Sequence, residues 1–357
     1  MRLVWGTVEA IAEETASVQR VAVHVDGAAD RSVAVVLIAL TGRADVGERV
    51  LCNTTAVELG LGTGGEHFVL ARAGEGVALD DPVAGHIMKL RYTPLQRDVT
   101  AVEEPASPHH AAMSDAVTLD GMPVVCCGLH SQMAMVAAGI KEVAPERTVA
   151  YLMTDDAALP LAVSRLVPAL VSAGLVDATV TCGQAFGGDH EAINLYSGLL
   201  AARHACGADV AIVALGPGIV GTATPFGHGG VAQGEALNAV ASLGGRAVAA
   251  LRVSFADPRA RHVPVSHQTL CALTGVALAP ALVAVPTLDP GQSQALEVAL
   301  DEAGVWRLHE PRFMASSPLP DMRGIGVTTM GRGPEEDAAF FHAAAAAGRL
   351  AASLLDG

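Results

Sequence analysis

The stretch Ala208–Asn238, ADVAIVALGPGIVGTATPFGHGGVAQGEALN, decides the fold that the sequence predicts. It opens with an apolar run, Val210–Leu215, and continues into a loop with six glycines between Gly216 and Gly230. An amphipathic segment with helical spacing resumes at about Gln233. A strand, a glycine-rich loop and a helix in this order present backbone N–H groups and a helix N-terminus to an anion. We therefore expect a ligand at this loop.

The same alternation of strand and helix extends in both directions from this stretch. Apolar runs typical of buried strands alternate with segments of helical length and spacing, which predicts a doubly wound, mainly parallel α/β sheet over residues 121–357. A helix over 334–355 closes the chain, with Pro334 suited to its first turn. The predicted strands are 123–129, 148–153, 177–182, 209–215, 246–253 and 282–286, and the predicted helices are 131–141, 160–174, 190–206, 233–243 and 292–303.

The N-terminal part of the chain has a different pattern. Residues 1–95 contain short β-branched runs at roughly ten-residue spacing, separated by glycine turns, which predicts a small β-barrel or sandwich domain. Residues 96–120 are acidic, contain prolines and lack periodicity, so we expect a linker there.

Composition restricts the class of partner. The chain has 357 residues, of which 51% are hydrophobic, and a net charge of −15, so we expect a soluble protein that binds neither nucleic acid nor a membrane. Its six cysteines form no CxxC pair, and no export signal precedes them, which favours a reduced, cytoplasmic protein. Abundant alanine and glycine suit tight packing between subunits, so a homo-oligomer is a further expectation.

Polar residues follow five of the predicted strands, while the strands themselves are apolar. Ligands of open parallel sheets bind beyond the carboxyl ends of the strands, so these residues are the candidate site. Four of them can exchange protons and are the candidate catalytic residues: Asp189, His190, His228 and Glu235. Eleven others are candidate ligand-binding residues: His130, Gly187, Gly188, Gly216, Gly218, Gly221, Thr222, Thr224, Arg259, Arg261 and His267.

Each of these groups also has a structural interpretation. The acids of Asp189-His190-Glu191 are typical of a helix start, and the arginines can simply be solvated. His130-Ser131 lies in GLHSQ, which lacks the GxSxG frame of a nucleophile elbow.

Several known site types are disfavoured. No lysine follows Lys141, so the glycine loop is not a Walker P-loop. Gly216–Gly221 has the GxGxxG form, but it lies late in its domain and no acid follows at the dinucleotide-binding offset. We assign no metal ligand because HExxH and paired Cys/His spacings are missing from the sequence, although the histidines could still converge on an ion. The cofactor stays unassigned.

Four segments carry a family resemblance: GQAFGGDHEAINLYSGLLAARH (Gly183–His204), GPGIVGTATPFGHGGVAQGEALNAV (Gly216–Val240), NTTAVELGLGTGGEHFV (Asn53–Val69) and SHQTLCAL (Ser266–Leu273). In these segments the chain resembles the bacterial family of unknown function called DUF3866. The resemblance covers nearly the whole chain and implies no activity, cofactor or catalytic residue.

Two functions follow from these expectations. The first is an enzyme that binds a small anionic metabolite at the glycine-rich strand-to-helix loops. The second is a non-catalytic metabolite-binding or oligomeric assembly protein. Acid–base groups within hydrogen-bond reach of an open site distinguish the first from the second.

Overall fold

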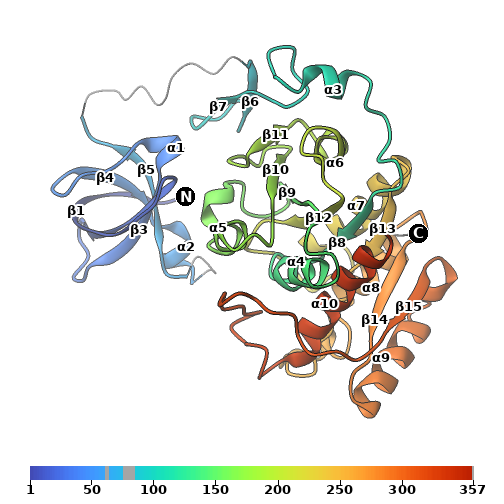
Figure 1. Ribbon diagram of the computed structural model, residues 1–357. Helices are drawn as coiled ribbons and strands as arrows, with labels where there is room; N and C mark the ends of the chain where they lie inside the picture. The colour runs from blue at the N-terminus through green and yellow to red at the C-terminus, as the bar shows by residue number, and fades with distance from the viewer. Residues whose placement is uncertain (61–63, 75–84, 356–357) are drawn as a thin grey trace. The chain divides into compact units, whose positions relative to one another are not determined.

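The computed structural model describes residues 1–60, 64–74 and 85–355, and the chain forms two compact units (Figure 1). One unit consists of Met1–Val83 with Leu90–Arg97, and the other of Ala84–Lys89 with Asp98–Gly357. Residues 61–63, part of a glycine run within the family-like segments, lie outside the described residues.

The first unit is a closed five-stranded barrel in the order β1-β2-β3-β5-β4. Its strands are β1 (Leu3–Glu14), β2 (Val18–Val25), β3 (Ser32–Leu37), β4 (Arg49–Asn53) and β5 (His67–Arg72), with the short helices α1 (Ile38–Thr41) and α2 (Thr55–Glu58). Alternate residues of each strand point inward, and valines such as Val8, Val21 and Val50 fill the interior. Of the two expected architectures, the barrel is the one observed.

The second unit contains an eight-stranded sheet in which all neighbours pair in parallel. The strand order is β11-β10-β9-β12-β8-β13-β14-β15. The strands are β8 (Pro123–Cys126), β9 (Val149–Thr154), β10 (Ala178–Cys182), β11 (His190–Ala192), β12 (Val210–Leu215), β13 (Arg246–Ala249), β14 (Leu282–Pro286) and β15 (Glu310–Met314). The fold class expected from the sequence, a small β domain followed by a doubly wound α/β sheet, is confirmed.

Helices cover both faces of this sheet. Residues of α6, α7 and α9 share one apolar core, and residues of α4, α5 and α10 share a second core with the opposite strand faces. The helices are α4 (Gln132–Val143), α5 (Leu166–Ser172), α6 (Leu195–His204), α7 (Ala232–Ser242), α8 (His267–Cys271), α9 (Pro290–Glu302) and α10 (Ala338–Ser353), with one-turn 3-10 helices at Leu161–Val163, Gly229–Val231, Ala260–His262 and Val305–Arg307 and a π-helical turn at Ala272–Val276.

The two cores explain why the strands read as continuous apolar runs. In β8, Val124 and Cys126 belong to one core, whereas Val125 and the following Cys127 belong to the other. A strand buried on both faces has no solvent side that would require polar residues. The apolar run therefore predicts the strand but does not show which residue faces which core.

Several predicted helix boundaries are wrong. The helix expected over 334–355 is α10, which begins only at Ala338, so Pro334 lies in a turn before it. The segment expected as one helix over 160–174 starts with a 3-10 turn, and α5 begins only at Leu166.

The sequence predicts a helix over 190–206, but His190–Ala192 forms strand β11 beside β10, and α6 begins only at Leu195. Asn194 sets this start, because its side chain accepts a hydrogen bond from the Ser197 backbone N–H and Ser197 Oγ accepts one from the Asn194 N–H, which together form a capping box. β15 and α8 were not expected from the pattern.

Residues 98–120 belong to the second unit. They contain α3 (His110–Ser114), and the Val102 N–H donates to the carbonyl of Glu191, a residue of β11. β6 (Ile87–Lys89) and β7 (Arg97–Val99) form a separate two-stranded sheet. The expected domain boundaries, with a linker over 96–120, stay a prediction.

Helix α10 packs closely against α4 because glycines leave room for the backbones (Figure 1). A methyl group on Gly139 would come within 2.6 Å of the Ala345 carbonyl oxygen, and one on Gly348 would overlap the Val136 carbonyl oxygen. Neither oxygen can move without shifting its helix. The alanine-rich face of α10 is therefore a packing surface, as its sequence suggests.

We expect Gly348→Ala to destabilise the α/β unit by about 1–3 kcal/mol, since an added methyl in a packed core forces a backbone shift. Urea unfolding measures the change. Gly291→Ala in α9 is the matched control, because its nearest neighbour, Asp289 Oδ1, lies at an ordinary 3.7 Å. Equal stability of the two variants would contradict the close-packing account.

Candidate functional site

The sheet has a topological switch point between β8 and β12. These strands are neighbours, but the chain leaves β8 toward α4 on one face and leaves β12 toward α7 on the other. The loops therefore separate at the carboxyl ends of the two strands and leave a crevice, which is where ligands bind in open α/β sheets.

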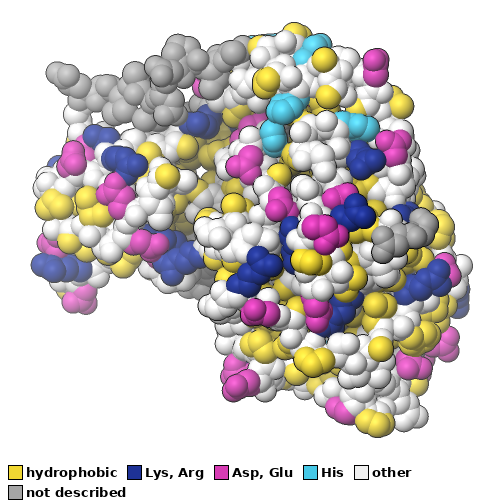
Figure 2. Space-filling model, in the orientation of Figure 1, with side chains coloured by type: hydrophobic (Ala, Val, Ile, Leu, Met, Phe, Trp, Pro, Cys, Tyr) yellow, Lys and Arg dark blue, Asp and Glu magenta, His cyan; other side chains and the backbone are white. Residues whose placement is uncertain are grey.

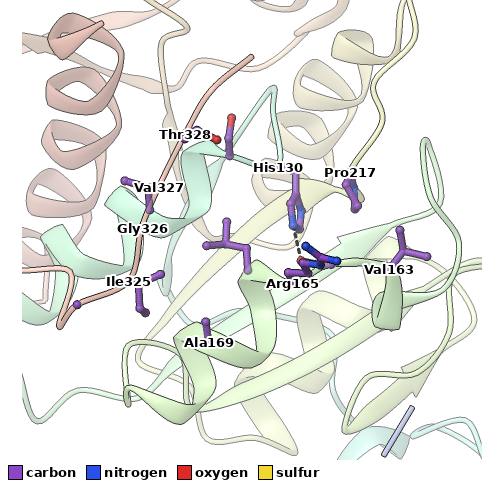
Figure 3. Close-up of a pocket in the computed structure, with 13 residues that line it drawn as sticks. His130, Val163, Arg165, Ala169, Pro217, Ile325, Gly326, Val327 and Thr328 are labelled. Carbon is purple, nitrogen blue, oxygen red and sulfur yellow. Dashed lines mark hydrogen bonds between the residues drawn. The ribbon is translucent and has the colours of Figure 1, made fainter. Parts of the chain in front are cut away.

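A pocket of about 670 Å³ lies at this switch point (Figure 3). His130 and Ser131 line it from the loop after β8, and Pro217 lines it from the loop after β12. Residues 163–165 line it from the turn before α5, Leu166 and Ala169 from α5 itself, and residues 324–328 from the segment before α10. Its volume falls in the range of small-molecule sites. Three neighbouring strand ends and a distant segment thus build one cavity.

His130 is the central polar side chain of this pocket. Its Nδ1 lies 3.1 Å from the Tyr151 hydroxyl and 3.3 Å from the Leu215 carbonyl oxygen, and its Nε2 lies 2.8 Å from Ser164 Oγ. Burial lowers the pKa of His130 to about 4 despite the opposing effect of the Leu215 carbonyl. The imidazole is therefore neutral at physiological pH and can accept a proton.

The glycine loop contributes little to the pocket beyond Pro217. Gly216 lies against the Ala158 carbonyl oxygen, which a side chain at this position would strike. Thr222 Oγ1 hydrogen-bonds with Thr224 Oγ1 at 2.9 Å, and the Gly227 N–H donates to Thr224 Oγ1 at 3.1 Å. The expected ligand-binding groups Gly218, Gly221, Thr222 and Thr224 are exposed in this folded-back loop.

Asp189 and His190 lie at the edge of the sheet. Asp189 Oδ2 accepts hydrogen bonds from the backbone N–H and hydroxyl of Thr179, 2.9 and 2.8 Å away. His190 packs edge-on against His109, with ring centroids 5.0 Å apart, and Figure 2 shows histidines gathered on the surface over α3, β11 and α6. Burial lowers the pKa of His190. β10 and β9 separate this edge from β12 and the loop that follows it.

The backbone N–H groups of Gly187 and Gly188, in the loop between β10 and β11, hydrogen-bond to other side chains of the protein. The Gly187 N–H donates to Glu191 Oε1 at 2.7 Å, and the Gly188 N–H donates to Thr181 Oγ1 at 3.2 Å. Glu235 is exposed on α7. The four candidate catalytic residues therefore do not form one constellation: Asp189 and His190 lie at the edge strand β11, His228 in the loop before α7, and Glu235 on α7.

A second polar cluster, which we call the arginine cluster, follows β13. Asp257 accepts two hydrogen bonds from the Arg259 guanidinium, at 2.9 and 2.8 Å, and one from Arg332 at 3.3 Å. The hydrogen bonds from Arg259 hold the pKa of Asp257 well below its usual range. The buried Arg252 donates to Gln268 at 2.7 Å, and burial lowers the pKa of Arg252 to about 10. The candidate ligand-binding residue Arg259 therefore forms an ion pair with Asp257 of the same protein.

Three histidines adjoin the arginine cluster. The rings of His228 and His262 each lie 5.3 Å from the ring of His267. Burial lowers the pKa of His262 to about 4, and the nearby charge of Arg252 lowers it further. Burial also lowers the pKa of His267, and the charges of His228 and Arg261 act in the same direction. The structure therefore brings the predicted residues His228, His267, Arg259 and Arg261 together, and places His130 in the pocket.

Among the residues that the structure describes, no three His, Cys, Asp or Glu side chains are grouped so that they could hold a metal ion. The cofactor stays unassigned.

Sequence reasoning missed Ser164, Arg165 and residues 324–328 as pocket residues. Ser164 lies ten residues beyond the end of β9, behind a 3-10 turn, and the strand-end rule does not reach that far. Residues 324–328 lie between β15 and α10 in sequence. No local pattern marks either segment, since only the tertiary fold brings them to the switch point.

The fold and the pocket define a doubly wound α/β protein with a small-molecule-sized cavity at its switch point and a β-barrel unit. The family model described as "Protein of unknown function (DUF3866)" matches residues 33–348, and the chain belongs to this family. No curated protein and no solved structure matches the sequence. Within the described residues, every helix is too short or too polar to cross a membrane.

The buried histidines beside the arginine cluster predict that acid lowers the stability of the folded protein. In the unfolded chain they bind protons near pH 6.5, whereas in the folded protein the lowered pKa of His262, about 4, keeps this ring neutral. Unfolding therefore takes up protons between about pH 6.5 and pH 4, so the free energy of unfolding falls as the pH falls through that window.

Urea unfolding midpoints at pH 7, 6 and 5 measure this decrease in the free energy of unfolding. In the His262→Gln variant the decrease should be smaller than in the wild-type chain. A midpoint that stays constant from pH 7 to pH 5, or an unchanged pH dependence in the variant, would contradict the burial of a neutral His262.

Proposed function

We propose that this protein is an enzyme that binds a small anionic metabolite in the pocket at the switch point between β8 and β12. The observation that carries the proposal is the charge of the lining. Among the described lining residues, Arg165 is cationic and none is Asp or Glu, in a chain whose net charge is −15. A lining that contains a cationic side chain and no acid suits an anion better than a cation.

The position of His130 supports catalysis over passive binding. A neutral imidazole that faces a cavity and is held by a fixed partner can take a proton from a bound substrate or a side chain. The proposed site therefore moves from the glycine loop to the pocket, while the proposed ligand class is unchanged. Proposals of a non-catalytic binding protein or a homo-oligomer rest only on the sequence.

We also propose that the protein works in the cytoplasm. All six cysteines are free, and Cys126, Cys127 and Cys182 are buried thiols whose pKa burial raises. Such thiols are inert and are typical of proteins in a reducing compartment.

Arg165→Gln tests the ligand class. Small carboxylates and phosphates are screened by the change in melting temperature that each one causes. We expect at least one of them to raise the melting temperature of the protein. Removing a charged hydrogen-bond donor costs about 1.5–3 kcal/mol, so Arg165→Gln should weaken this ligand by roughly 10- to 150-fold.

Arg312→Gln on β15 is the control, because Arg312 is outside the pocket and pairs with Glu310. Ligand affinity that is unchanged in Arg165→Gln but lost in Arg252→Gln would place the anion in the arginine cluster and contradict the proposal.

A further inference from the structure

Ser164 and His130 form a hydrogen-bonded pair on the wall of the pocket. Ser164 Oγ lies 2.8 Å from His130 Nε2, and both residues line the cavity. They come from different loops, His130 from the end of β8 and Ser164 from the turn before α5. A serine hydroxyl within this distance of an imidazole is the signature of an activated nucleophile.

A helix cap alone does not explain this arrangement. Ser164 Oγ accepts a hydrogen bond from the Val167 N–H at 3.1 Å, which satisfies the first turn of α5. That bond uses the oxygen as an acceptor and leaves the hydroxyl proton available. The contact with His130 Nε2 is additional, and it directs this proton toward a base.

The Leu215 carbonyl orients the histidine for that role. A carbonyl oxygen can only accept, so its contact with His130 Nδ1 at 3.3 Å is a hydrogen bond when the proton is on Nδ1. In that tautomer the Tyr151 hydroxyl, 3.1 Å from Nδ1, also accepts from it, and the unprotonated Nε2 faces Ser164. Nucleophile, base and an orienting group that fixes the base are the three parts of a serine triad, here with a backbone carbonyl in the third position.

We propose that Ser164 is a nucleophile, that His130 is its general base, and that the pocket hydrolyses a small carboxylic ester bearing an anionic group. This inference rests on the proposed function for the binding of the anionic group, while the Ser164–His130 pair carries the nucleophile independently.

The reaction has two balanced halves. Ser164 Oγ attacks the ester carbonyl carbon while its proton passes to His130 Nε2, and the C–O bond to the alcohol then breaks as the departing oxygen takes that proton. Water next attacks the acyl carbon and gives a proton to Nε2. The acid leaves, and Ser164 Oγ recovers the proton.

An alkyl fluorophosphonate, which phosphonylates an activated serine with loss of fluoride, tests the nucleophile directly. Intact-protein mass spectrometry of the full chain should show one adduct. Ser164→Ala should show none, and His130→Gln should react at least about 100-fold more slowly, since base catalysis contributes about 10²–10⁴-fold. Ser172→Ala, an exposed serine of the same helix α5, is the control and should react like the wild-type chain.

The outcomes separate this inference from the binding proposal. No adduct on the wild-type chain, or an adduct that persists in Ser164→Ala, overturns the nucleophile. If an anion still raises the melting temperature of an unreactive wild-type chain, only the nucleophile is lost and the binding proposal stands. Melting curves of His130→Gln check that slow labelling does not come from unfolding.

Discussion

Burial of both faces of the eight-stranded parallel sheet is the constraint on which the rest of the α/β unit depends. With two apolar cores, the interiors of the strands hold few polar side chains, so most of the polar residues collect where the strands end. At the switch point between β8 and β12, the connecting chains leave toward opposite faces of the sheet. The pocket at His130 is a consequence of this topology.

The two polar regions at the strand ends differ in whether their paired side chains face a cavity. In the arginine cluster, Asp257 is bound by Arg259 and Arg332, and Asp337 accepts from Ser254 and Arg332, so most charges already have internal partners. In the pocket, His130 and Ser164 pair with each other beside a cavity. The first arrangement stabilises the connection after β13, and the second is suited to act on a ligand.

Sequence reasoning succeeded where the pattern is local. The apolar runs located the six predicted strands because doubly buried strands contain few polar residues, and the strand-end rule found His130 because it follows β8 within four residues. Glycine content was a poorer guide to the site. Gly216 and Gly188 allow close approach of backbones, and the N–H groups of Gly187 and Gly188 bond to side chains of the protein. Ser164 and residues 324–328 required the tertiary fold, because nothing in their own sequence links them to His130.

The most direct test of the central claim is the location of bound anions in crystals soaked in bromide, read from an anomalous difference map. A pocket at the switch point that recognises anions predicts a peak beside Arg165 and His130. Peaks confined to the arginine cluster or to the loop over 183–191, with none in the pocket, would contradict the account.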